Sequence, residues 1–353
     1  MHKKFRMSLH KLISTHRCFS FRPSAARELQ RCIRDAIKDG TPIYKWSYLS
    51  QVEKSLSDPN ATVMDISALA WSLNKLSLDD ANTWNKAVVR LIEVGKPGIN
   101  NLSAFLFSVA NAIGREPSLL SVESRMTLSN MLRQLFEDKS FLATASLADI
   151  SQLCYSVSAM FPKQSLSRPI FERATDILTS LPTREGSDGI PVLSSCKEIV
   201  LLWSSLRIRR SKDDRIPHKF LEALLESSRG LRYCEDMNQN KIGQLSDSIS
   251  VLGTSDPRIV FQIIHFMDSN ESGLNSKNLL RIIRAMSRLG IDNEILWKRI
   301  ASRLEQPVGL DYSVKELGDI QNAFSLMKNN RRVLGILDLY IKTKLDAARY
   351  GTF

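Results

Sequence analysis

Three arginines spaced for one face of a helix are the residues of this sequence best suited to bind an anion. Arg281, Arg284 and Arg288 lie at i, i+3 and i+7, with no acidic residue between them. Side chains at this spacing share a helical face. Guanidinium groups bind phosphate oxygens in a bidentate manner, so three in a row would suit a polyanion. The alternative is a solvated charged face with no ligand.

Further cations and three aromatic residues extend this candidate site. A second basic cluster is expected to contact a phosphate backbone rather than base edges. It consists of Arg207, Arg209, Arg210 and Lys212. The aromatic residues are Trp71, Phe107 and Tyr155. Rings that stack on bases, together with cations that meet phosphates, are typical of grooves for single-stranded RNA. The alternative is that these rings pack against neighbouring helices.

Two carboxylates fall on the same predicted face as the arginines. Asp247 and Asp319 would repel phosphate, so the sequence does not favour one continuous RNA groove along the whole chain. No catalytic constellation accompanies these residues. The five cysteines include no CxxC pair, and the chain has no P-loop, GxSxG or HExxH motif. We therefore expect neither an enzyme nor a cofactor or metal site.

The segments that carry these residues recur along the chain. If Ile66 is taken as position zero, six equivalent positions follow at steps of 36 to 49 residues. They are Leu102, Ile150, Ile199, Ile242, Leu279 and Leu317. Positions three and seven are apolar in all seven copies, and position six is always serine or alanine. This pattern predicts seven helices, each with an apolar stripe beside a position where a neighbouring helix comes close.

A second helix is predicted after each of these first helices, and three of the second helices begin at or near a proline. We therefore expect an all-α fold, a right-handed α-solenoid of about seven helix-turn-helix repeats. The repeats should occupy residues 62–346, with N-terminal capping helices over 25–61 and a C-terminal tail over 347–353.

The first 24 residues have the composition of a mitochondrial presequence. Seven basic residues and no acidic residue lie before Glu28, and they account for seven of the twelve excess positive charges. The run from Arg17 to Ser20 resembles a matrix-protease site with cutting after Phe19. Import into the mitochondrial matrix is therefore expected. A plastid transit peptide and a basic tail with a binding role of its own are the alternatives.

Three of the repeated segments resemble a known signature. They are ALAWSLNKL (68–76), KIGQLSDSISVLG (241–253) and LLRIIRAMSRLG (279–290). All resemble the LAWALAKLG-type pattern of organellar helical repeats, namely octotricopeptide and heptatricopeptide repeats and those of FAST-kinase-like RAP proteins. The resemblance implies an organellar protein that binds RNA in transcript processing, stability, translation or ribosome assembly. Many such proteins end in a RAP domain, for which the last repeat, running almost to Phe353, leaves no room.

Two functions follow as expectations. The first is a mitochondrial RNA-binding helical-repeat protein, with single-stranded or ribosomal RNA as its partner. The second is a non-catalytic adaptor or scaffold that holds other proteins, as a peripheral subunit of a mitochondrial ribosome or respiratory complex. No apolar run approaches the roughly 18 residues that a membrane span needs, so we expect no membrane-spanning helix.

Overall fold

A computed structural model of the chain describes residues 24–162, 165–185, 189–210, 217–269, 274–304, 312–325 and 331–350. Within these residues there are seventeen α-helices and no β-strand, and one isolated bridge pairs Thr183 with Pro191. The expected all-α class is confirmed. Apart from Ser24, the predicted presequence lies outside the described residues.

The seven predicted first helices all form. They are α4 (Val63–Lys75), α6 (Ile99–Arg115), α9 (Leu147–Met160), α11 (Cys196–Arg210), α13 (Gln239–Leu252), α15 (Ser276–Arg288) and α17 (Val314–Ser325). The side chains at positions zero, three and seven are at most 1 % exposed in every copy. Each predicted stripe is therefore core, as the period of the pattern requires. The small side chains at position six are also buried in all seven helices.

Small residues lie beside the stripe at position six in every first helix and at position one in five of the seven. At position six, serine hydroxyls donate within their own helix, as Ser72 does to the Ala68 carbonyl at 2.8 Å. At position one, which the sequence did not single out, Ser67 donates to the Asn101 carbonyl of the next first helix at 2.8 Å. A Cβ added to Gly243 at the same position would lie 2.5 Å from Asn278 Oδ1. Position one is therefore where the following first helix approaches.

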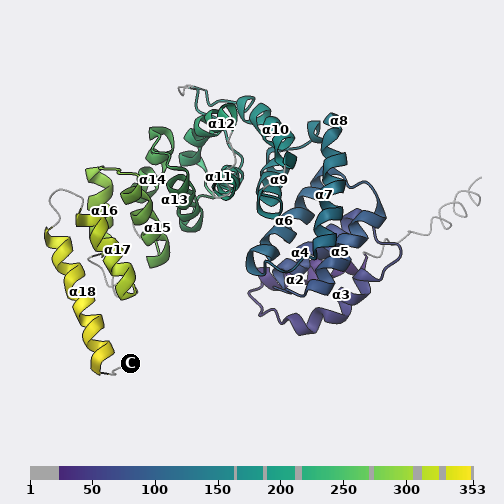
Figure 1. Cartoon of the computed structure of the whole chain (residues 1–353), viewed down its shortest axis with the longest axis horizontal. Coiled ribbons are helices and arrows are strands. Elements are labelled where there is room, and N and C mark those ends of the chain that lie inside the picture. Colours follow the sequence, from purple (N-terminus) through teal and green to yellow (C-terminus); the bar gives the residue numbers. More distant parts are fainter. Residues whose placement is uncertain are drawn as a thin grey trace, which may run out of the picture.

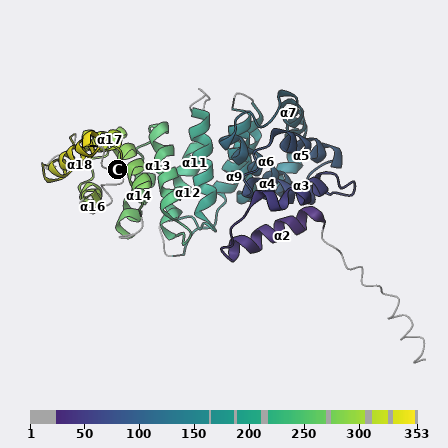
Figure 2. The same cartoon turned by 90° about the horizontal axis from the view of Figure 1, so that it is seen from below.

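The second helices form a separate layer. They are α5 (Ala81–Val94), α7 (Val122–Glu137), α10 (Arg168–Thr179), α12 (His218–Ser228), α14 (Pro257–Ser269), α16 (Glu294–Leu304) and α18 (Arg331–Tyr350). Each first helix from α4 to α17 packs on the next, while α10, α12, α14 and α16 pack in sequence in the second layer. Figure 1 shows the helices following one another along an arch, with the first helices towards its inner side. The view from below keeps the same order (Figure 2).

The N-terminal helices extend both layers, because α2 (Ala25–Lys38) packs on α4 and α3 (Leu49–Leu56) packs on α5. A 3-10 turn, η1 (Lys45–Tyr48), joins them. The buried Asp65 carboxylate fixes this junction: it accepts hydrogen bonds from Ser24, Arg27 and Thr62. Thr62, rather than Asp65, caps α4, and Asp65 completes the capping box from the third helical position.

Three short elements were not expected from the sequence: α8 (Lys139–Ala143), η2 (Ser165–Ser167) and η3 (Arg229–Tyr233). They fall in the three longest repeats, where extra residues must be accommodated. In the second layer α7 packs on α8 and η2, which in turn contact α10. The last helix, α18, continues to Tyr350, past the expected end of the repeats at 346.

Candidate functional site

The three arginines of α15 lie beside the two carboxylates that were expected to repel phosphate. Arg281 Nε is 3.2 Å from Asp247 Oδ2 of α13, and Arg284 Nη2 is 2.6 Å from Asp319 Oδ2 of α17. Arg288 is exposed and makes no ion pair within the described part of the chain. The arginine row is therefore not an isolated patch of positive charge. Two of its three members already have counter-ions on the neighbouring first helices.

Arg284, Arg288 and Asp319 also line a pocket of about 280 Å³ between α15 and α17. Asn322, also on α17, contributes an amide to its wall. An anion that entered here would meet the unpaired Arg288 directly. It would have to compete with Asp319 for Arg284, which weakens any phosphate contact.

The described members of the second basic cluster, Arg207, Arg209 and Arg210, have different surroundings. Arg207 lies 3.8 Å from Asp247 Oδ2 and shares that carboxylate with Arg281. Arg209 is only 7 % exposed. It donates to Ser167 Oγ and lies over the Phe171 ring at 5.3 Å, facing the second layer. Arg210 is exposed, and Lys212 lies outside the described residues. The burial of Arg209 and its bond to Ser167 argue against a phosphate contact from this residue.

The three aromatic residues are half-buried on the first helices, and each meets a neighbouring group. Phe107 and Tyr155 lie with ring centroids 5.7 Å apart across α6 and α9. Lys197 Nζ of α11 is 5.3 Å from the Phe107 ring. Burial raises the pKa of Tyr155, although Arg207 acts in the opposite direction. The two rings therefore pack against each other across neighbouring helices, and Phe107 also has a cation over its face.

Trp71 on α4 forms the other aromatic group. The Arg34 guanidinium of α2 lies 5.2 Å from its ring centroid, and Lys75 Nζ lies 5.8 Å away. Such contacts are worth about 0.5–1 kcal/mol at exposed sites. A ring flanked by two cations suits a stacked base with phosphates on either side.

Four positions of each first helix point away from the buried stripe: positions two, five and nine, and the residue two before position zero. We call the surface that these positions form the outward face. Among the described residues its cations are Lys75, Lys197, Lys277, Arg281, Arg284, Arg288 and Lys315. Its described carboxylates are Asp247 and Asp319. Six of the seven cations lie from α11 to α17, so this half of the face keeps a positive surplus even after both ion pairs are counted.

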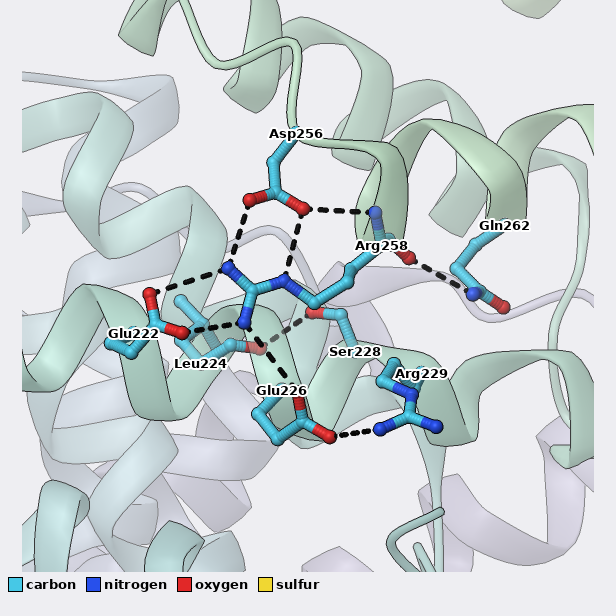
Figure 3. Close-up of polar contacts among 8 residues, drawn as sticks. All are labelled: Glu222, Leu224, Glu226, Ser228, Arg229, Asp256, Arg258 and Gln262. Atoms are coloured by element: carbon cyan, nitrogen blue, oxygen red, sulfur yellow. Dashed lines mark hydrogen bonds and ion pairs between the residues drawn. The ribbon is translucent and has the colours of Figure 1, made fainter. Parts of the chain in front are cut away.

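An ion-pair network in the second layer was not predicted from the sequence. Arg258 of α14 lies 2.6 Å from Glu222 Oε1 of α12 and 2.8 Å from Asp256 Oδ2 (Figure 3). The hydrogen bonds that Arg258 donates to Asp256 and Glu222 raise the pKa of Arg258, and the bond from Arg258 lowers the pKa of Glu222. The sequence feature that could have indicated this network is the spacing of 36 residues between Glu222 and Arg258, which is about one repeat.

The described residues contain no group of three or more His, Cys, Asp or Glu side chains that could hold a metal ion. Burial raises the pKa of Cys154, and that of Cys196 to about 12, so these thiols are not reactive thiolates at neutral pH. Over the ranges that the structure describes, no helix has the length and apolar character to cross a bilayer.

Neither a protein-family model nor a curated protein sequence matches this chain. The chain is an all-helical protein whose seven first helices repeat one buried pattern and pack on one another in order. Its distinguishing surface is the outward face, where cations and aromatic rings lie together.

Proposed function

We propose that this chain is a right-handed α-solenoid that binds single-stranded RNA along the outward face of its first helices. The observation that carries the proposal is the positive surplus of this face from α11 to α17, next to the cation-bearing rings Trp71 on α4 and Phe107 on α6. The organellar helical-repeat families that the repeated segments resemble mostly bind organellar RNA, which favours the same ligand here. The role we infer is in mitochondrial RNA metabolism or mitoribosome assembly.

The repeated pattern of small and apolar residues in the first helices supports the proposed solenoid. Small residues at position six of every first helix, and at position one of five of the seven, let neighbouring first helices lie close together. The second helices add an outer layer that covers the stripes. Stacked helical hairpins of this kind grow by addition of units and present an extended surface along one side.

The contacts on the outward face support RNA as the ligand. Cations neutralise phosphates and release counter-ions, whereas rings such as Trp71 and Phe107 stack on bases of any sequence. Asp247 and Asp319 hold Arg281 and Arg284 in place before RNA arrives, and phosphate must compete with them. We therefore expect moderate affinity, strong dependence on salt and little sequence preference.

The localisation we propose is the mitochondrial matrix, with residues 1–24 as the presequence and the plastid as the alternative. Cutting after Phe19 would leave Ser24 and Arg27 in place to bind Asp65. A fluorescent protein fused to residues 1–27 should enter mitochondria. A cytosolic signal would contradict this localisation.

A protein adaptor is the second candidate, because the second layer exposes apolar side chains. Val122 and Met126 lie one turn apart on α7 and are 76 % and 62 % exposed. An exposed apolar patch in this layer would suit a protein partner. The ion pairs of Arg281 and Arg284 favour the same function, since they reduce the charge available to RNA.

Crosslinking in cells separates the two candidates. The tagged protein is crosslinked with ultraviolet light, purified under denaturing conditions and sequenced for attached RNA. The proposal predicts covalently bound RNA that decreases when Arg281, Arg284 and Arg288 are all replaced by Gln. Recovery of a stable protein partner without RNA would favour the adaptor.

A further inference from the structure

A small pocket on the outward face, between α15 and α17, has room for one ring system. The two helices pack side by side (Figure 1). The pocket has a volume of about 280 Å³, and its lining includes Arg284, Arg288, Asp319 and Asn322. Sites for drug-sized ligands begin at about 300 Å³, so a single base is of suitable size. The pocket lies within the surface to which we have assigned RNA.

The polar side chains of this pocket are accessible to a ligand. Arg288 and Asn322 are exposed, and neither side chain forms a hydrogen bond or ion pair within the described part of the chain. The side chains of Arg284 and Asp319 are 45 % and 36 % exposed. A ligand that enters the pocket therefore meets a guanidinium, an amide and a carboxylate.

The Asp319 carboxylate uses only one of its two oxygens. Oδ2 accepts from Arg284 Nε at 3.2 Å and from Arg284 Nη2 at 2.6 Å. Oδ1 accepts no hydrogen bond from the residues that the structure describes. The pair also holds the guanidinium plane of Arg284, and bases stack on such planes in RNA complexes. The pocket thus offers a hydrogen-bond acceptor next to a flat surface.

This carboxylate decides which kind of group the pocket favours. It repels phosphate, so a phosphate is disfavoured although two arginines line the pocket. A neutral ligand with N–H donors is favoured instead, because the donors pair with Asp319 while Arg288 donates to an acceptor on the same ligand. Nucleobases carry donors and acceptors on the edges of one ring system. A base, rather than the RNA backbone, therefore fits this pocket.

We propose that this pocket binds a guanine base of the RNA, an inference that rests on the proposed function. Guanine presents the adjacent acceptors O6 and N7, which an arginine binds in a bidentate manner, and Arg288 supplies that fork. The N1–H and N2–H groups of guanine donate to Asp319, and Asn322 adds an amide from the same helix. Uracil has one N–H donor and no N7, so it uses fewer of these groups. The pocket adds a preference for guanosine at one position of a surface that otherwise has little sequence preference.

The test compares two labelled oligonucleotides of about twelve nucleotides, one of uridine alone and one with a single guanosine at its centre. Fluorescence anisotropy with the full chain measures both affinities. The proposal predicts that the guanosine strengthens binding about tenfold. Adenosine or cytidine at the same place should have a smaller effect.

Asp319→Asn and the matched control Asp247→Asn locate this preference. Each variant removes a carboxylate that holds one arginine of the row, so each should strengthen the binding of all-uridine RNA. Asp319 lines the pocket, whereas Asp247 pairs with Arg281 from α13 and does not. Asp319→Asn should therefore lose the preference for guanosine, and Asp247→Asn should keep it.

Equal binding of the two oligonucleotides by the wild type would overturn the proposal and leave the RNA function standing. A stronger preference for another base would overturn the assignment of guanine. A guanosine preference that survives Asp319→Asn would overturn the assignment to this pocket. If neither oligonucleotide binds at low salt, the proposed RNA function fails, and this proposal fails with it.

Discussion

Arg284 and Asp319, 35 residues apart in the chain, join α15 to α17 through a contact of 2.6 Å between Nη2 and Oδ2. Asp247 binds Arg281 in the same way from α13, so the arginine row is held between two carboxylates of the adjacent repeats. Partly exposed pairs of this kind contribute little to stability, about 0–1 kcal/mol. Their larger effect is on what the arginines can bind.

Neutralising these two carboxylates should strengthen RNA binding. In the double variant Asp247→Asn and Asp319→Asn, both arginines become free to meet phosphate. The slope of log affinity against log salt should then steepen by up to about 1.4, from about 0.7 per phosphate. Fluorescence anisotropy with a labelled poly-uridine oligonucleotide measures this. An unchanged affinity and slope would show that phosphate does not compete for these arginines.

Two glycines at position one of the first helices should respond oppositely to alanine. Gly243→Ala places a Cβ against Asn278 and Arg281 and should destabilise the fold by about 1–3 kcal/mol. Gly318→Ala meets nothing within 4 Å and should stabilise it by about 0.4–1 kcal/mol. Urea unfolding compares the two variants. Equal effects would mean that α13 and α15 do not approach closely at Gly243.

A larger side chain at position six should also destabilise the fold. Ser248 is fully buried, and replacing it with Leu should overpack α13 at a cost of about 1–3 kcal/mol. The control, Gln244→Leu, adds the same side chain to the exposed side of the same helix and should change stability by no more than about 0.5 kcal/mol. Thermal melts of both variants test the register, and an unaffected Ser248 variant would contradict it.

Asp65 should make the N-terminal junction sensitive to acid. Desolvation acts to raise its pKa, but hydrogen bonds from Ser24, Thr62 and Arg27 outweigh this and lower the pKa below the ordinary value. A lowered pKa stabilises the fold above the unfolded-state pKa of about 3.9, and this contribution is lost as the pH falls through the folded-state pKa.

The measurement is the melting temperature between pH 6 and pH 2 for the wild type and Asp65→Asn. The wild type should lose more stability than the variant as the pH falls below about 4. Asp39→Asn, at an exposed carboxylate just after α2, is the control and should follow the wild type. Parallel curves for wild type and Asp65→Asn would contradict the role given to Asp65.

Much of the fold could be predicted because buried apolar residues recur in the sequence with the period of an α-helix. The apolar stripes, such as those that begin at Ile66, Leu102 and Ile150, predicted where every first helix lies and which side of it is buried. The short elements η3 and α8 could not be predicted, because they accommodate extra residues without a period of their own. Position one was missed because Val200 and Leu280 interrupt its run of small residues.

The candidate site was predictable only in part, because helical phase gives the face of a residue but not its partner. Arg281 and Arg284 lie on the face expected for them, yet their pairing with Asp247 and Asp319 depends on how the next repeat is placed. Arg209 lies on a different side of α11 from Arg207, since a difference of two residues turns it by about 200° towards Phe171. The pocket between α15 and α17 could not be predicted, because its walls come from two repeats and their distance is a property of the packed structure.

If the outward face binds single-stranded RNA through Arg281, Arg284 and Arg288, the affinity must depend on salt through these three side chains. Affinity for a labelled poly-uridine oligonucleotide is measured from low to physiological salt for the wild type and for the triple variant of Arg281, Arg284 and Arg288 to Gln. The account predicts weaker binding by the variant and a slope reduced by roughly 0.7 to 2, depending on how far Asp247 and Asp319 give up their arginines. An intact fold by circular dichroism with unchanged RNA affinity and slope would contradict it.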